Sequence, residues 1–274
     1  MDRTDINTDS EKRGKFLFLA GVITLAIFLT KILQGTDSVA SWRVYLDGAI
    51  YFIVAFAGLL WAFNFQIKMK SLLYILQSSL FVFSEVIFVE IFFFQKFDRL
   101  YEGFILFALL VLIFLGIYVS FLMANVFNVD LFKKLPLVQV GRTSSYLISL
   151  LMMYFLTFGF LSSSFPIYLV LPLILITYVL IPFIHYVNMG MEEGELWRKT
   201  LLTSAISLML FFGVFLTGST HELTAIAPAL GYYFAVSMVT QEQIFRKNSV
   251  SFIFSMILLS VIFFIIIFFN IISN

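Results

Sequence analysis

The chain has 274 residues, of which 61% are hydrophobic and only 12% are charged. A soluble domain carries roughly 25% charged residues, so this composition excludes an ordinary water-soluble protein and indicates a membrane protein in contact with lipid. The formal net charge of +1, without a long basic run, argues against nucleic acid as a partner. Because the chain has no cysteine and two histidines, we expect no disulfide, no metal site and no cofactor.

Nine runs are long and apolar enough to cross a membrane, since a hydrocarbon layer about 30 Å thick needs roughly 20 residues of helix. They lie at residues 16–34, 45–66, 71–94, 102–125, 144–161, 165–187, 200–218, 222–241 and 249–271. We predict an all-α polytopic helix bundle of residues 16–274, after a cytoplasmic N-terminal tail of residues 1–15.

The first run has a second interpretation. Basic residues at 12–15 precede it and the small residues 38–40 follow it, which is the pattern of a cleaved signal peptide. Cleavage would leave eight spans. Lys31 and Asp37, in the long segment before the small residues, favour an uncleaved first span.

The basic residues predict the orientation of the spans. Thirteen Lys and Arg residues lie in the tail and in the connections on its side of the membrane, against four on the other side. Basic residues collect on the cytoplasmic side of membrane proteins. We therefore expect a multi-pass protein with its N-terminus in the cytoplasm and its C-terminus outside.

Two glutamates interrupt the third apolar run. Glu85 falls about 4 Å from the expected bilayer midplane and Glu90 about 11 Å from it, on the outer side. At about 100° per residue, Glu85 shares a polar strip with Tyr74, Gln77 and Ser84, whereas Glu90 is turned about 140° away. The strip is a candidate intramembrane polar site.

A charged side chain at this depth costs about 2.5 to 3.5 kcal/mol, so we expect Glu85 to be protonated or paired and to face the bundle. It serves either as a proton- or ion-responsive group or as a neutral acid that fixes helix packing through hydrogen bonds to the strip. Glu90 is expected to extend to the outer headgroups and meet Lys31 or Lys96.

A candidate outer-side site combines Asp47, Glu90, His221 and Glu222, if the bundle brings them together. Asp47 is also expected to pair with Arg43, four residues before it on the second span.

Residues 218–223, GSTHEL, unite Ser, His and Glu, but Ser219 and Glu222 have the spacing of a capping box at the start of the eighth span. Residues 191–199, MEEGELWRK, lack the spacing of intramembrane CAAX-type proteases and predict a charged interfacial loop anchored by Trp197. Neither stretch is a catalytic motif, so we do not expect enzymatic activity, and an enzyme is kept as an alternative.

Prolines interrupt two of the later spans. Pro172 in the sixth span and Pro228 in the eighth are candidate kinks, because an interior proline removes a helical hydrogen bond. They superpose when the chain is shifted by 56 residues, which is compatible with an internal repeat of two helix hairpins. Interrupted helices in corresponding positions are found at transporter binding sites.

The stretch ANVFNVDLFKKLPL, residues 124–137, resembles a family of small multi-span membrane proteins of candidate-phyla bacteria. The resemblance rests on Asn125, Phe127, Asn128, Lys134, Pro136 and Leu137, and on the arrangement of the spans. It implies a location in the bacterial inner membrane and carries no activity.

Three functions of different class remain. The leading hypothesis is a non-enzymatic subunit or assembly factor, whose partners are membrane lipids and other membrane protein subunits. The second is a small proton-linked transporter or lipid-handling protein that uses Glu85 and the proline-interrupted spans. The third is an intramembrane enzyme that uses His221 and Glu222.

Overall fold

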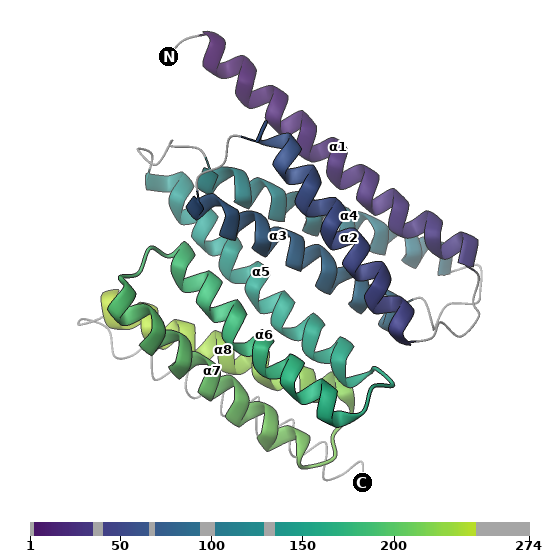
Figure 1. Ribbon diagram of the computed structural model, residues 1–274, viewed down its shortest axis with the longest axis vertical. Helices are drawn as coiled ribbons and strands as arrows, with labels where there is room; N and C mark the ends of the chain where they lie inside the picture. Colours follow the sequence, from purple (N-terminus) through teal and green to yellow (C-terminus); the bar gives the residue numbers. More distant parts are fainter. Residues whose placement is uncertain (1–2, 35–40, 66–68, 94–101, 129–134, 245–274) are drawn as a thin grey trace. The chain divides into compact units, whose positions relative to one another are not determined.

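The computed structural model describes most of the chain, and all its regular structure there is helical (Figure 1). The described residues are 3–34, 41–65, 69–93, 102–128 and 135–244. Within these ranges the chain forms eight α-helices, one short π-helix and no strand, which confirms the all-α fold class.

The helices divide into two compact units, unit 1 (Met1–Ile148) and unit 2 (Ser149–Asn274). The elements are α1 (Arg3–Gln34), α2 (Ser41–Ala62), α3 (Met69–Phe88), η1 (Val89–Phe93), α4 (Glu102–Asn128), α5 (Leu135–Leu161), α6 (Ile167–Asn188), α7 (Glu193–Phe215) and α8 (His221–Ile244). Helix α5 crosses the boundary between the units. Helix α1 begins at Arg3, so most of the predicted tail continues the first helix.

Seven helices, α1 to α7, contain segments long and apolar enough to cross a membrane. Helix α8 coincides with the predicted eighth span but is not among these seven. The predicted ninth span, residues 249–271, lies outside the described residues. Several helices long and apolar enough to span a membrane are therefore confirmed, and the number nine stays a prediction.

Helix α3 lies inside unit 1. It packs against α2 and α4, and α1 in turn packs against both of these helices. In an 18-residue stretch of its segment Leu72–Ile91, 67% of the residues are buried, against 28% of such a stretch in the segment Trp42–Ala62 of α2. The polar residues of α3 therefore lie in protein rather than against lipid, where unsatisfied polar groups are costly.

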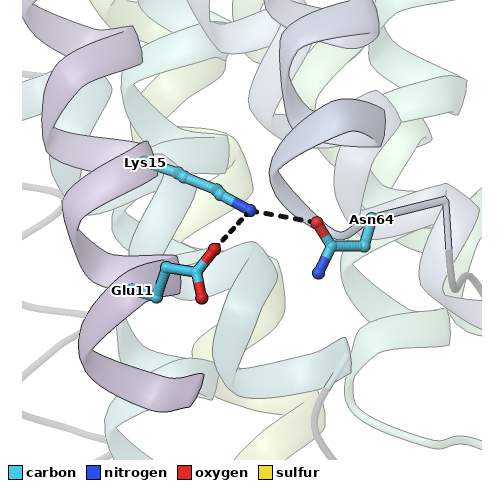
Figure 2. A network of polar contacts seen from close by, with 3 residues as sticks. All are labelled: Glu11, Lys15 and Asn64. Atoms are coloured by element: carbon cyan, nitrogen blue, oxygen red, sulfur yellow. Dashed lines mark hydrogen bonds and ion pairs between the residues drawn. The ribbon is translucent and has the colours of Figure 1, made fainter. Parts of the chain in front are cut away.

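A polar contact joins the start of the apolar part of α1 to the end of α2 (Figure 2). Lys15 Nζ lies 2.9 Å from Glu11 Oε1 and donates a hydrogen bond to Asn64 Oδ1 at 3.0 Å. The same ammonium lies 5.5 Å from the ring centroid of Trp61. Lys15 in the first half of α1 thus meets Asn64 after the end of α2, whereas Thr30 near the end of α1 meets Tyr51 in the middle of α2, so the two helices are antiparallel. Their short connection predicts this arrangement.

In unit 2 a proline in α6 is compensated by α7. Pro182 has no N–H, so it cannot donate the helical hydrogen bond to the carbonyl of Tyr178. Ser204 of α7 supplies the missing donor, because its hydroxyl lies 2.7 Å from Tyr178 O. The hydroxyl of a neighbouring helix thus satisfies the released carbonyl, which lipid requires.

Helices α7 and α8 approach each other closely at a glycine. A Cβ atom on Gly231 would lie 2.9 Å from Ser207 Cα, which is backbone and cannot swing away. A side chain on α8 at this position would separate the two helices. Small residues at such crossings give membrane helices their packing energy.

The start of α8 differs from the sequence prediction. Helix α8 begins at His221, so Thr220 rather than Ser219 precedes it. The Ser219 hydroxyl lies 2.9 Å from the hydroxyl of Thr217 and makes no bond to Glu222, so the predicted capping box is wrong. The turn between α7 and α8 contains Gly218, which has a φ of 73°, and α8 begins three residues later, at His221.

Replacing Ser204 by Ala should lower the free energy of unfolding by about 1 kcal/mol, because the Tyr178 carbonyl loses the hydroxyl donor that stands in for the missing N–H of Pro182. Reversible unfolding in mixed micelles measures this change. Ser207→Ala is the matched control: the Ser207 hydroxyl is buried without a partner in the described part of the chain, so its removal should not destabilise the protein. Equal losses in the two variants would contradict the assignment.

Candidate functional site

The carboxyl group of Glu85 lies inside unit 1. The residue is 6% exposed, and its neighbours Val82 and Val86 are buried as well. The apolar run around Glu85 forms a regular turn of α3, which places the side chain toward the interior rather than toward lipid. The prediction that Glu85 faces the bundle is therefore confirmed within unit 1.

A glycine on α4 gives the carboxyl group its room. A Cβ atom on Gly116 would lie 2.8 Å from Glu85 Oε1 and 3.3 Å from the ring of Phe81. Any larger residue at position 116 would push the carboxyl away. Helices α3 and α4 thus meet at Glu85 with little space between them.

The predicted polar strip is buried along its length, but its members do not bind Glu85. Tyr74, Gln77, Ser84 and Glu85 are all less than a tenth exposed. Gln77 Nε2 donates to the Ser145 carbonyl at 3.2 Å, and Ser145 Oγ donates to Gln77 Oε1 at 3.2 Å. The Ser84 hydroxyl donates to Phe81 O at 2.7 Å.

Glu85 is left without a hydrogen-bonding group. Its Oε2 is buried and has no partner in the part of the chain that the structure describes. The prediction that hydroxyls and amides of the strip satisfy this carboxyl is wrong, because the nearby donors are committed to other acceptors. A buried acid in this state is costly, and such costs concentrate at functional sites.

Glu90 lies in the π-helix η1, which follows α3 directly. It is 2% exposed, so the prediction that it extends to the headgroups is wrong. On the helical wheel Glu90 lies beside Ser79, which is also buried, so this face of α3 is covered by protein rather than open to the headgroups. The proposed partner Lys96 lies outside the described residues.

Tyr51 of α2 lies near the acidic residues Asp47 and Glu90 of unit 1. Its hydroxyl lies 3.1 Å from Thr30 Oγ1 of α1. Sequence reasoning missed Tyr51. The available signal is its position four residues after Asp47, which places both on one face of α2.

The outer-side residues do not form the ion pair that the sequence predicts, and they belong to two different units. Asp47 makes no ion pair with Arg43 in the described structure; Arg43 is exposed, whereas Asp47 Oδ2 is buried. The predicted pair is therefore not formed between these two described side chains. Asp47 and Glu90 belong to unit 1, while His221 and Glu222 belong to unit 2.

In unit 2, His221 is exposed and Glu222 is half-buried at the start of α8. The charge of Glu222 acts on the hydroxyl of Tyr154 in α5. Within the described ranges, no three His, Asp or Glu side chains come together as a metal site.

Residues 191–199 form a helix start rather than the predicted loop. Helix α7 begins at Glu193, and Lys199 Nζ lies 2.7 Å from Glu195 Oε2 one turn earlier. Lys199 is 4% exposed, so the pair neutralises a buried cation. Trp197 is exposed and packs on Phe183 at 5.1 Å between ring centroids, in keeping with an interfacial anchor.

The candidate kinks lie where the sequence places them, Pro172 inside α6 and Pro228 inside α8. Bending at these positions stays a prediction. Pro182, which sequence reasoning did not single out, is the proline whose released carbonyl has an identified partner.

Comparison of the chain with family models, with curated proteins and with solved structures finds no match. The resemblance of residues 124–137 to a family of small membrane proteins therefore stays a prediction.

Gly116→Ala should displace the Glu85 carboxyl, since the added methyl group would occupy the place of Oε1. Infrared spectroscopy of the protein in lipid should show the Glu85 carboxyl band shifted, with little change in stability because the end of a Glu side chain can move. Gly21→Ala is the control: a Cβ there meets only Phe114 at 4.0 Å. An identical Glu85 band in wild type and Gly116→Ala would contradict the contact.

Proposed function

We propose that the chain is a small proton-linked membrane transport protein in which Glu85 takes up and releases the proton. The observation that supports this function is the buried carboxyl of Glu85, which lies in a spanning helix without a hydrogen-bond partner in the described structure. An acid that only fixed helix packing would bond to a neighbouring helix, as Gln77 does to Ser145.

The surroundings of Glu85 favour a proton over a metal ion. Calcium and magnesium need about six or more oxygen ligands, and Glu85 meets Gly116 and the ring of Phe81 instead. The nearby hydroxyl of Ser84 is turned to a backbone carbonyl. A proton needs only the carboxyl group itself.

The proposed topology has nine spans, with α8 as the eighth and residues 249–271 as the ninth. The N-terminus lies in the cytoplasm, the C-terminus lies outside, and the membrane is a bacterial inner membrane. The excess of basic residues in alternate connections supports this orientation.

A non-enzymatic subunit or assembly factor is the second candidate, with membrane lipids and other membrane subunits as partners. Short connections between the later helices support it: residues 162–166, 189–192 and 216–220 leave no room for a soluble domain in this part of the chain. Under this function Glu85 would hold a fixed protonation state.

The two functions differ in the behaviour of Glu85. In lipid, wild type should show a carboxylic-acid band that is absent from Glu85→Gln and that disappears reversibly as the pH rises, because a transport group must lose its proton to water. Infrared titration measures the band. Glu193→Gln, which removes an exposed carboxyl of α7, should leave the band intact.

A Glu85 band that stays constant at every pH at which the protein is folded would refute the transport function. So would the absence of such a band at every pH. In either case Glu85 would mainly serve helix packing, and the subunit function would lead.

A further inference from the structure

Pro182 divides α6 into two parts that are held by different neighbours. The longer part, before the proline, is tied to α5, because the Tyr178 hydroxyl lies 3.0 Å from Thr157 Oγ1. Thr157 gives its own hydrogen to the Met153 carbonyl at 2.7 Å, so Tyr178 donates the bond between the helices. The Tyr178 ring also meets Phe211 near the end of α7, edge-on at 5.9 Å between centroids. This part of α6 therefore belongs with α5 and the C-terminal half of α7.

The part of α6 that follows the proline is tied to the start of α7 instead. The Tyr186 hydroxyl lies 2.6 Å from Thr203 Oγ1. The ring centroids of Phe183 and Trp197 lie 5.1 Å apart. A short turn joins the two helices at this end. Residues 183–203, here called the hairpin end, are thus held together by contacts of their own.

Ser204 links the two parts of α6 across the proline. Its Oγ lies 2.7 Å from the Tyr178 carbonyl and also 2.7 Å from the Thr200 carbonyl of its own helix. A hydroxyl has one hydrogen, so it makes a full bond to only one of these oxygens at a time. The bond that replaces the missing helical bond at Pro182 is therefore made or broken by rotation of a single hydroxyl.

The second acceptor of Ser204 gives α7 a bending point of its own. A serine hydroxyl that bonds to the carbonyl four residues earlier destabilises a helix slightly and often bends it. Just beyond Ser204, α7 is fixed to α8, since a Cβ atom on Gly231 would lie only 2.9 Å from Ser207 Cα. Both helices of the hairpin thus have a weak point close to the contact between Ser204 and Tyr178.

We infer that the hairpin end is a hinged segment that moves at Pro182 and Ser204, with the bond between Ser204 and the Tyr178 carbonyl as its latch. In the latched arrangement Ser204 donates to Tyr178 O. In the released arrangement it donates to Thr200 O, and the hairpin end moves away from the rest of unit 2. The hinge goes beyond the proposed function, which rests on Glu85 in unit 1.

Release of the latch has a consequence for water. The Tyr178 carbonyl then loses its donor, and lipid cannot supply another. Water must therefore enter between α6 and α7 when the hairpin end opens. The opening also loosens the contact of His185 with Tyr232 of α8, whose ring centroids lie 5.9 Å apart. The hinge gives unit 2 the two discrete arrangements that a gate requires.

Hydrogen–deuterium exchange of the backbone tests the hinge. Mass spectrometry of the protein in lipid nanodiscs compares the amides of the hairpin end with those of α8 and of the first part of α6. In Pro182→Ala the regained N–H bonds to the Tyr178 carbonyl without the latch. Exchange in the hairpin end should therefore slow by about fivefold, and exchange in the other two segments should change much less.

Ser204→Ala acts in the opposite direction. The latch is lost while the proline remains, so exchange in the hairpin end should become about fivefold faster. Pro172→Ala is the matched control, because Pro172 lies in the same helix before the hinge and its replacement also regains an N–H. This control should leave exchange in the hairpin end unchanged.

A hinge requires that these effects stay local. Equal slowing of exchange in all helices of unit 2 in Pro182→Ala would show that the helices open together, and would overturn the hinge. So would a Pro172→Ala variant that slows the hairpin end as much as Pro182→Ala does, because α6 would then act as one rigid rod. A Glu85 carboxyl that never titrates would refute the transport function and leave the hinge standing.

Discussion

The absence of water in the hydrocarbon layer is the constraint on which this structure depends. Every backbone amide and carbonyl in a spanning segment has to find its partner within the protein. Helices meet that demand internally, and interior prolines and polar side chains create local exceptions. In unit 2 the carbonyl released by Pro182 accepts a hydrogen bond from Ser204. In unit 1 the Glu85 carboxyl oxygen Oε2 has no hydrogen-bond partner among the described residues.

The buried polar side chains of unit 1 are of two kinds: those that bond to a neighbouring helix, and Glu85, which does not. The amide of Gln77 and the hydroxyls of Ser78 and Ser145 form closed sets of hydrogen bonds that join α3 to α4 and α5. Such bonds contribute about 0.6 kcal/mol each between membrane helices and define which faces meet. Glu85 lies among them yet takes no part, so its cost is not offset by packing specificity.

Much of the fold follows from the sequence. Apolar runs of about 20 residues predict α1 to α7 because lipid permits few alternatives. A regular 3.6-residue period places Tyr74, Gln77, Ser84 and Glu85 on one buried strip, as the structure has them.

The failures lie where that period or a tertiary contact intervenes. The sequence does not indicate that the face of α3 that carries Ser79 and Glu90 is buried as well, or that a π-helix follows α3. Asp47 is half-buried and makes no ion pair with Arg43 in the described part of the chain, an outcome that depends on the packing of α2 against α3. Glycine spacing does not reveal that Gly116 faces a carboxylate.

The bond between Ser204 and the Tyr178 carbonyl also has a consequence for variation of the sequence. A residue with an N–H at position 182 would restore the helical bond to Tyr178, and the Ser204 hydroxyl would keep only its 2.7 Å contact with Thr200 O. Conversely, loss of the Ser204 hydroxyl should lower the free energy of unfolding more where position 182 is proline than where it is a residue with an N–H. Positions 182 and 204 therefore form a compensating pair, and in related chains a change at one should accompany a change at the other.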